Sequence, residues 1–215
     1  MQNFFKMNKQ KFFKFDFSNE NKVTNFYVNQ TNIEAYNGVL NLNNKHILLV
    51  GPKKSGKSHL ADLWCKKNNG IGLKSNLDHI INNNLNVFID NIHLGFEEEK
   101  LFFVINHCIV NNLKILITTS FDINEINFLL KDLISRLKTF SYLRINQPDD
   151  DMLINVLTKL FVDKQFIINS KDIFQFIIKK TNRSYDNMIE IVKKLDTLSL
   201  EKKRQLTIPL IKEIL

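Results

Sequence analysis

The fold class of this chain follows from one short stretch: Gly51, Pro52, Lys53, Lys54, Ser55, Gly56, Lys57, Ser58. It has the complete pattern GxxxxGK[ST], and it lies directly between an apolar segment, 47–50, and a helical pattern over 58–67. Glycines let the backbone amides turn toward phosphate, while the amino end of the helix adds a positive field. Lys57 can neutralise phosphate oxygens and Ser58 can ligate Mg²⁺. We therefore expect ATP or ADP with Mg²⁺ at this loop, rather than a fortuitous glycine turn.

A carboxylate is expected beside this loop. Apolar residues 87–89 predict a buried strand that ends in Asp90. From there the carboxylate would reach the Mg²⁺ shell, although an acid at such a place can also simply cap a strand. The next residue is Asn91, and an amide cannot accept the proton of an attacking water. Intrinsic hydrolysis should therefore be slow unless another group substitutes.

Two more sets of polar residues lie at positions suited to nucleotide chemistry. Thr118, Thr119 and Ser120 form the polar end of the strand predicted from residue 115, where a polar side chain could contact the γ-phosphate or the attacking water, or merely cap the strand. Arg136 comes just before the last predicted strand, a position suited to projecting toward the nucleotide of a neighbouring molecule. The alternative for Arg136 is a surface ion pair with Asp132.

The order of predicted elements indicates an α/β fold. Strands are expected at 47–50, 71–73, 87–89, 115–118 and 142–145, with helices between them that include a short one near 123–130. This alternation is typical of a parallel sheet that is covered by helices on both faces. After residue 148 only helices are expected, with these candidate N-caps: Asp149, Ser170, Ser184, Thr207. The sequence therefore predicts an extended arm at 1–20, a nucleotide-binding α/β domain with a five-stranded parallel sheet at 21–148, and an all-helical lid at 149–215.

Two residues near these elements have an open role. Arg183 would open the third lid helix, from which it could reach back to a phosphate, or it could be solvated. His59 follows Ser58 in the loop, and packing or surface exposure is a better explanation for it than catalysis.

Composition excludes several other classes of protein. No apolar run approaches the roughly 18 to 20 residues of a membrane span, and the first residues lack a secretory signal, so a cytoplasmic protein is expected. The only cysteines, Cys65 and Cys108, suggest neither a disulfide framework nor a zinc site. The net charge of +8 permits contact with nucleic acid, but the lysines are scattered along the chain.

The loop continues into His59, Leu60 and Ala61, and together with residues 25–28 and 133–137 it resembles the DnaA family of AAA+ proteins. Within that family, residues 90–92 and the C-terminal 206–215 are similar to the Hda group of regulatory inactivators. The resemblance runs from about residue 23. DnaA continues into a helix-turn-helix domain and this sequence stops after the lid, so direct origin recognition is not expected.

What the Hda resemblance implies is a regulator of replication initiation. Such a protein, bound to nucleotide and to the sliding clamp on DNA, triggers hydrolysis of the ATP held by DnaA and so prevents re-initiation. Arg136 matches the arginine finger of the family, a guanidinium that acts in trans on a neighbour's γ-phosphate. The sensor arginine of the family falls near Asp186, so Arg183 either substitutes for it or sensing from the lid is altered.

The same resemblance implies that the clamp is held by a short N-terminal peptide with Gln and spaced apolar residues. The matching residues in this chain are Gln10, Phe12, Phe13, Phe15, where the family favours Leu and Pro. DNA would then be reached mainly through the clamp, and homo-oligomer formation stays open. The alternative function is an autonomous DnaA-like or helicase-loader ATPase that acts on DNA. A third hypothesis, a kinase that acts on a small molecule, fits the sequence less well than these two.

Overall fold

The computed structural model describes residues 26–73, 77–166, 172–202 and 206–215. The arm predicted at 1–20, with its candidate clamp-binding peptide, lies outside the described residues, and so does Ser170.

A parallel five-stranded sheet forms the centre of the first part of the chain. Its strands are β1 (His46–Val50), β2 (Gly70–Gly72), β3 (Asn86–Ile89), β4 (Ile115–Thr119) and β5 (Ser141–Arg144), in the order β2-β3-β4-β1-β5. Every neighbouring pair is parallel. The apolar runs of β1 and β4 are almost wholly buried because helices cover both faces of the sheet.

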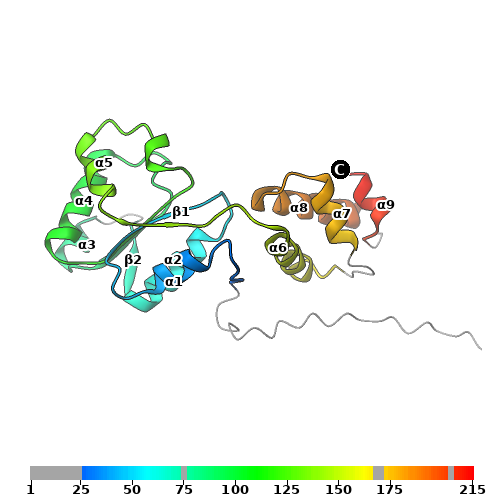
Figure 1. The fold of residues 1–215 in the computed structure, drawn as a ribbon, viewed down its shortest axis with the longest axis horizontal. Coiled ribbons are helices and arrows are strands. Elements are labelled where there is room, and N and C mark those ends of the chain that lie inside the picture. Colours follow the sequence, from blue (N-terminus) through cyan, green and yellow to red (C-terminus); the bar gives the residue numbers. More distant parts are fainter. Residues whose placement is uncertain (1–25, 74–76, 167–171, 203–205) are drawn as a thin grey trace, which may run out of the picture.

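Two helical layers bury two separate cores against this sheet (Figure 1). On one face lie α1 (Ile33–Leu40) and α2 (Lys57–Asn68), whose core includes Trp64. On the other face lie α3 (Leu77–Asn82), α4 (Glu98–Val110) and α5 (Lys131–Leu137), with a core that includes Leu101 and Leu133. The predicted five-stranded α/β fold is therefore confirmed; β1, β2, β3 and β5 begin one residue earlier than expected, and β4 ends one residue later.

One predicted helix does not form. The pattern over 123–130 predicted a short helix, but only the 3-10 turn Ile123–Glu125 forms. A capping box starts it: the carboxylate of Asp122 accepts from the backbone N–H of Asn124, and that of Glu125 accepts from the backbone N–H of Asp122. The helical pattern then ends, and the next residues form a loop that leads into α5.

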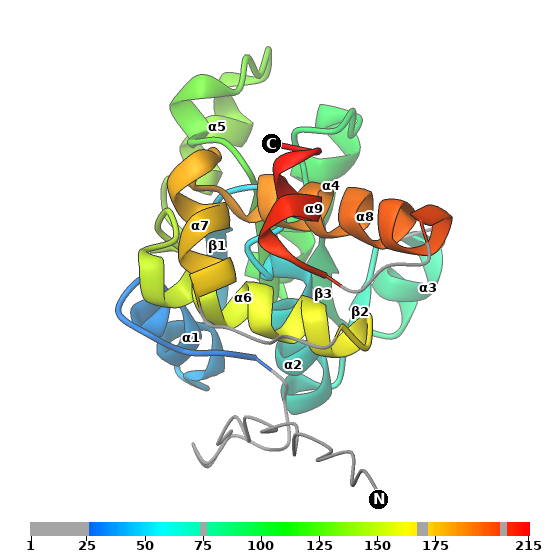
Figure 2. The same cartoon turned by 90° about the vertical axis from the view of Figure 1, so that its right-hand side faces the viewer.

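The remaining described chain is helical: α6 (Asp150–Asp163), α7 (Asp172–Lys180), α8 (Tyr185–Lys202) and α9 (Ile208–Lys212). Figure 2 shows these helices grouped together in front of the sheet. They share a core of their own, centred on Phe161, Phe174 and Met188. The expected N-caps of α6 and α9 are present: the side chain of Asp149 accepts the backbone N–H of Met152, and that of Thr207 accepts the backbone N–H of Leu210. In the described residues no helix is long and apolar enough to cross a membrane.

Candidate phosphate-binding site

The GxxxxGK[ST] loop leaves β1 and turns directly into α2. Lys54 and Gly56 both have positive φ, 63° and 90°, a conformation that turns successive backbone amides toward one side. Gly56 is required for a second reason, because a Cβ there would lie 2.7 Å from the ring of Phe26. The loop is therefore closely covered on that side and has the backbone geometry of an anion cradle.

Lys57 is the buried cation of the site, with only 5% of its surface exposed. Its Nζ donates to the carbonyl oxygens of Gly51 and Pro52, each at 2.9 Å, and to Oγ of Ser120 at 3.2 Å. Burial lowers the pKa of Lys57 to about 8, with a nearby carboxylate, Asp90, acting in the opposite direction. A phosphate group would supply the negative charge that this buried cation lacks.

Asp90 is held by hydroxyl groups on both of its oxygens. Ser58 Oγ donates to one oxygen at 3.0 Å, and Thr118 Oγ1 donates to the other at 2.5 Å. Thr118 in turn accepts the backbone N–H of Asn91 at 2.9 Å. The structure thus brings together Ser58 and Asp90, which the sequence places 32 positions apart.

This pair suits Mg²⁺. Among the described residues no group of three or more His, Cys, Asp or Glu could hold a metal by itself. Mg²⁺ is commonly bound by one or two protein oxygens together with waters and the phosphates of a nucleotide, so the hydroxyl of Ser58 and the carboxylate of Asp90 are a fitting donor set.

Thr119, the last residue of β4, and Ser120, which follows it, have different surroundings. Ser120 faces Lys57, as described above, and so lies at the loop. Thr119 is fully buried, and its hydroxyl donates to the carbonyl of Phe121 at 3.2 Å, which is the ordinary bonding of a strand end. The geometry therefore favours Ser120 as the residue that meets a terminal phosphate.

His93 is a further residue beside the site that the sequence analysis does not name. Its position three residues after Asp90 is the one signal in the sequence that could have indicated it. Its Nδ1 lies 3.4 Å from the backbone N of Ser120, which donates to it, and 3.3 Å from Oγ1 of Thr119. Burial, and then the charge of Lys57, lower the pKa of His93. With Nδ1 accepting a hydrogen bond, a neutral ring keeps its proton on Nε2.

His59 belongs to the packing around the loop. Its ring stacks on Phe26 with centroids 5.6 Å apart, and Phe26 stacks on Tyr36 in turn. No hydrogen bond of His59 to Lys57, Ser58 or Asp90 occurs among the described residues, so the structure places it beside the chemistry rather than in it.

The lid contacts the loop through a carboxylate. Asp186, in the first turn of α8, forms an ion pair with Lys53 at 3.3 Å. Arg183, the candidate sensor, instead forms an ion pair with Asp150 at the start of α6. A role of Arg183 at the phosphates stays a prediction, and it requires the release of Asp150.

Asp186→Asn is expected to raise the affinity for ATP about two- to fivefold, the size of an exposed charge effect. The substitution removes a negative charge from beside the GxxxxGK[ST] loop and frees Lys53 to meet a phosphate that binds there. Titration of a fluorescent ATP analogue measures this. Asp196→Asn is the matched control, because Asp196 lies on the same helix and is paired with Lys164 instead. Equal affinities for Asp186→Asn and wild type would contradict the prediction.

Arg136 takes part in none of these hydrogen bonds or ion pairs. It is exposed on α5, and among the described residues its guanidinium forms no ion pair, with Asp132 or with any other acid. The surface pairing considered as an alternative is thus not present there. The side chain is available to a second molecule.

Comparisons with known proteins agree with this architecture. Residues 150–215 match the family model described as "Hda, lid domain". No curated protein matches the chain. Domain III of the replication initiation protein DnaA from Thermotoga maritima is similar in fold, with a TM-score of 0.73 and 14% identity, over 89% of this chain and 93% of that one. AMPPCP-bound DnaA from Aquifex aeolicus gives 0.64 and 16% identity, over 86% of this chain and 68% of that one. The sheet and lid therefore form a AAA+ fold.

Proposed function

We propose that this Hda-like chain, with its AAA+ fold and Hda-type lid, is a DnaA-related regulator of replication initiation that binds ADP or ATP and stimulates hydrolysis of the ATP bound to DnaA. One observation carries the proposal. The candidate phosphate-binding residues lie around Lys57, whereas Arg136 is exposed and forms no ion pair within the described residues. This separation of the nucleotide loop from an exposed arginine suits a protein that holds its own nucleotide and acts on the nucleotide of a second protein.

The chain's own site is proposed to hold a nucleotide and to turn it over slowly. The backbone amides of residues 51–58 and the Nζ of Lys57 would bind the phosphates, and Ser58 with Asp90 would hold Mg²⁺. A base for the attacking water is lacking at Asn91. The Nδ1 of His93 accepts the backbone N–H of Ser120 and is therefore not available as that base.

The hydrolysis that this chain stimulates is proposed to occur on the ATP bound to DnaA. A guanidinium that is supplied in trans stabilises the charge that develops on the γ-phosphate in the transition state. Arg136 meets the requirements for such a group, because it is exposed, always charged and free of an internal acid among the described residues.

The sliding clamp is proposed as the second partner of this chain. The chain would bind the clamp where it sits on chromosomal DNA, in the cytoplasm. This part rests on sequence alone, since Gln10, Phe12, Phe13 and Phe15 lie outside the described residues. A tether of this kind would raise the effective concentration of the chain near DnaA without requiring direct DNA contact.

The test is the rate of hydrolysis of DnaA-bound ATP with this protein, the clamp and primed DNA. Wild type should accelerate hydrolysis, and Phe12→Ala with Phe13→Ala should remove the part that depends on the clamp. Phe4→Ala with Phe5→Ala is the control in the same arm. If DnaA is unaffected and the chain hydrolyses ATP by itself on DNA, the autonomous ATPase is the correct function.

A further inference from the structure

The edge of the sheet opposite the GxxxxGK[ST] loop has an unusual composition. All strands are parallel, so their amino ends share one edge, whereas the loop leaves the carboxyl end of β1. Each helix from α1 to α5 ends just before a strand begins, and none of the five segments that join them contains Asp or Glu: 41–45, 69, 83–85, 111–114 and 138–140. Lysines do occur in and beside these segments.

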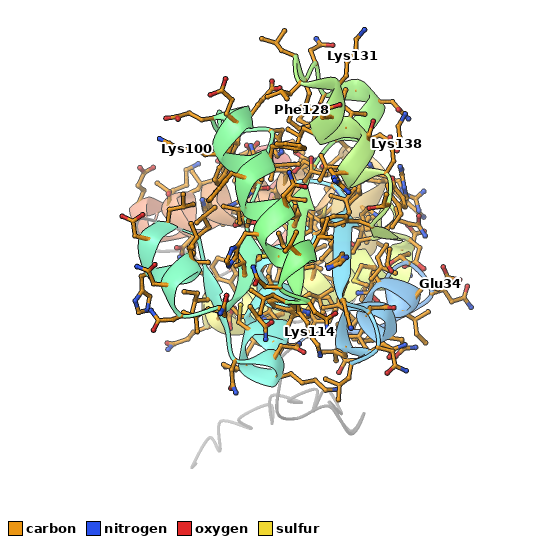
Figure 3. All side chains as sticks on the ribbon, turned by 90° about the vertical axis from the view of Figure 1, so that its left-hand side faces the viewer. Glu34, Lys100, Lys114, Phe128, Lys131 and Lys138 are labelled. Atoms are coloured by element: carbon orange, nitrogen blue, oxygen red, sulfur yellow. The ribbon has the colours of Figure 1, made fainter. Side chains whose placement is uncertain are left out.

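Three of these lysines, the amino-edge cluster, lie together: Lys45, Lys67 and Lys114. Ile47 pairs in register with Leu116, and both belong to the core under α1 and α2. Lys45 and Lys114 lie two residues before them, so their backbones are roughly 4.8 Å apart and their side chains point to that same side of the sheet. Lys67 is in the last turn of α2, which covers this side. Figure 3 shows Lys114 toward the lower end of the molecule, with Lys131 at the upper end.

The ammonium groups of the cluster are held by neutral oxygens. Each donates one hydrogen bond: Lys45 to Oδ1 of Asn112 at 2.6 Å, Lys67 to the carbonyl of Leu40 at 2.7 Å, and Lys114 to Oδ1 of Asn68 at 2.7 Å. None of the three forms an ion pair among the described residues. An ammonium has three N–H groups, so one bond positions it without using up its donors. Cations that are already positioned lose little freedom on binding.

The negative charges closest to the cluster do not cancel it. Along the chain the nearest acids are Glu34, Asp62 and Asp122. Glu34 is in the first turn of α1 and Asp122 follows the carboxyl end of β4, so both belong to the other edge. Asp62 is one helical turn before Lys66 and interacts with that lysine, which is therefore not counted in the cluster. The ends of α1 and α2 carry about half a negative charge each, so together they offset about one of three positive charges.

We infer that the amino-edge cluster binds the phosphate backbone of duplex DNA, with the edge of the sheet that faces away from the nucleotide loop. Charge complementarity supports this partner, because DNA phosphates recur at short regular intervals and each contact with a cation releases bound counterions. Contacts to phosphates alone read no base sequence, so the binding is not sequence-specific. The inference goes beyond the proposed function, in which DNA is reached through the clamp, and it does not depend on any action on DnaA.

The test is the salt dependence of the affinity of the full chain for a short DNA duplex, measured by fluorescence anisotropy without clamp or DnaA. The triple variant Lys45→Gln, Lys67→Gln, Lys114→Gln removes three charges, while its amides can still donate to the same oxygens. It should weaken binding at least about tenfold at low salt and reduce the slope of log K against log salt by about 2.7, which is about 0.9 for each phosphate contact. The corresponding triple Arg variant should keep the wild-type slope.

A charge-matched control separates the cluster from net charge. Lys131→Gln with Lys179→Gln and Lys193→Gln also removes three charges, from exposed positions on α5 and in the lid, and should keep the wild-type slope. An equal fall of the slope in both triple variants would overturn the inference, because binding would then follow net charge alone. An equal loss of affinity for polyglutamate and for the duplex would also overturn it, since the cluster would then bind acidic chains of any kind.

The fold of the variants is checked by ADP affinity, which should equal that of wild type because the cluster lies at the other edge of the sheet. If the triple Gln variant does not fold, Lys114→Gln alone should lower the slope by about 0.9. A wild-type slope in that folded single variant would count against the inference. Each of these contrary results leaves the proposed stimulation of hydrolysis on DnaA standing, since that activity is measured separately.

Discussion

Arg136→Ala should abolish the stimulation of ATP hydrolysis on DnaA, with a loss on the order of 10³ to 10⁵ in the stimulated rate, as for arginine fingers of other NTPases. The expected size is large because the guanidinium acts on charge that exists only in the transition state. Single-turnover hydrolysis of radiolabelled ATP on DnaA measures it. The chain should still bind its own nucleotide, since Arg136 is exposed on α5 and forms no hydrogen bond or ion pair with the residues around Lys57 in the described structure.

Two variants make this prediction specific. Arg136→Lys keeps the charge but loses the planar fork, so it should recover only a small part of the activity. Lys138→Ala removes another exposed cation two positions away and should leave most of the stimulation intact. An equal loss in Lys138→Ala and Arg136→Ala would mean that the basic surface acts as a whole and that Arg136 is not a finger.

The fold could be predicted because the strongest signals are local. The apolar runs of β1 and β4 are buried on both faces, so they read as strands without any knowledge of their neighbours. β2 and β5 lie at the two edges of the sheet and are not fully buried, and these are the two strands that are shifted as a whole by one residue from their predicted limits. Over 123–130 the capping box of Asp122 and Glu125 starts a helical turn, but the backbone of Ile126 is extended, with φ −89° and ψ 120°, so only a single 3-10 turn forms.

The candidate site could be predicted in part. Lys57, Ser58 and Asp90 belong to patterns with a fixed place beside strands, so the sequence identified them. Thr118 holds Asp90 across 28 positions, and Asp186 reaches Lys53 from the lid. The first contact depends on which strands are neighbours in the sheet, and the second depends on how the lid packs against the loop. The spacing of apolar residues along the sequence predicts neither.

The second large effect is expected for Lys57→Ala. Charge-assisted hydrogen bonds contribute about 1.5–3 kcal/mol each, so loss of the cation should weaken ADP and ATP binding by roughly 10- to 100-fold or more. The substitution also leaves the carbonyl oxygens of Gly51 and Pro52 without their donor, so circular dichroism must show that the fold is kept. Lys66→Ala, on an exposed position of α2, is the control and should bind as wild type does.

The pH dependence of binding tests the same group independently. The pKa of Lys57 is about 8 before phosphate binds, and a bound anion raises it because the cation is then compensated. Above pH 8 the neutral amine must therefore take up a proton on binding, so wild-type ADP affinity should fall by up to about tenfold per pH unit. Calorimetry from pH 7 to about 9.5 with EDTA present measures this fall. Lys57→Ala should lack it, and an unchanged slope in that variant would assign the titration to another group.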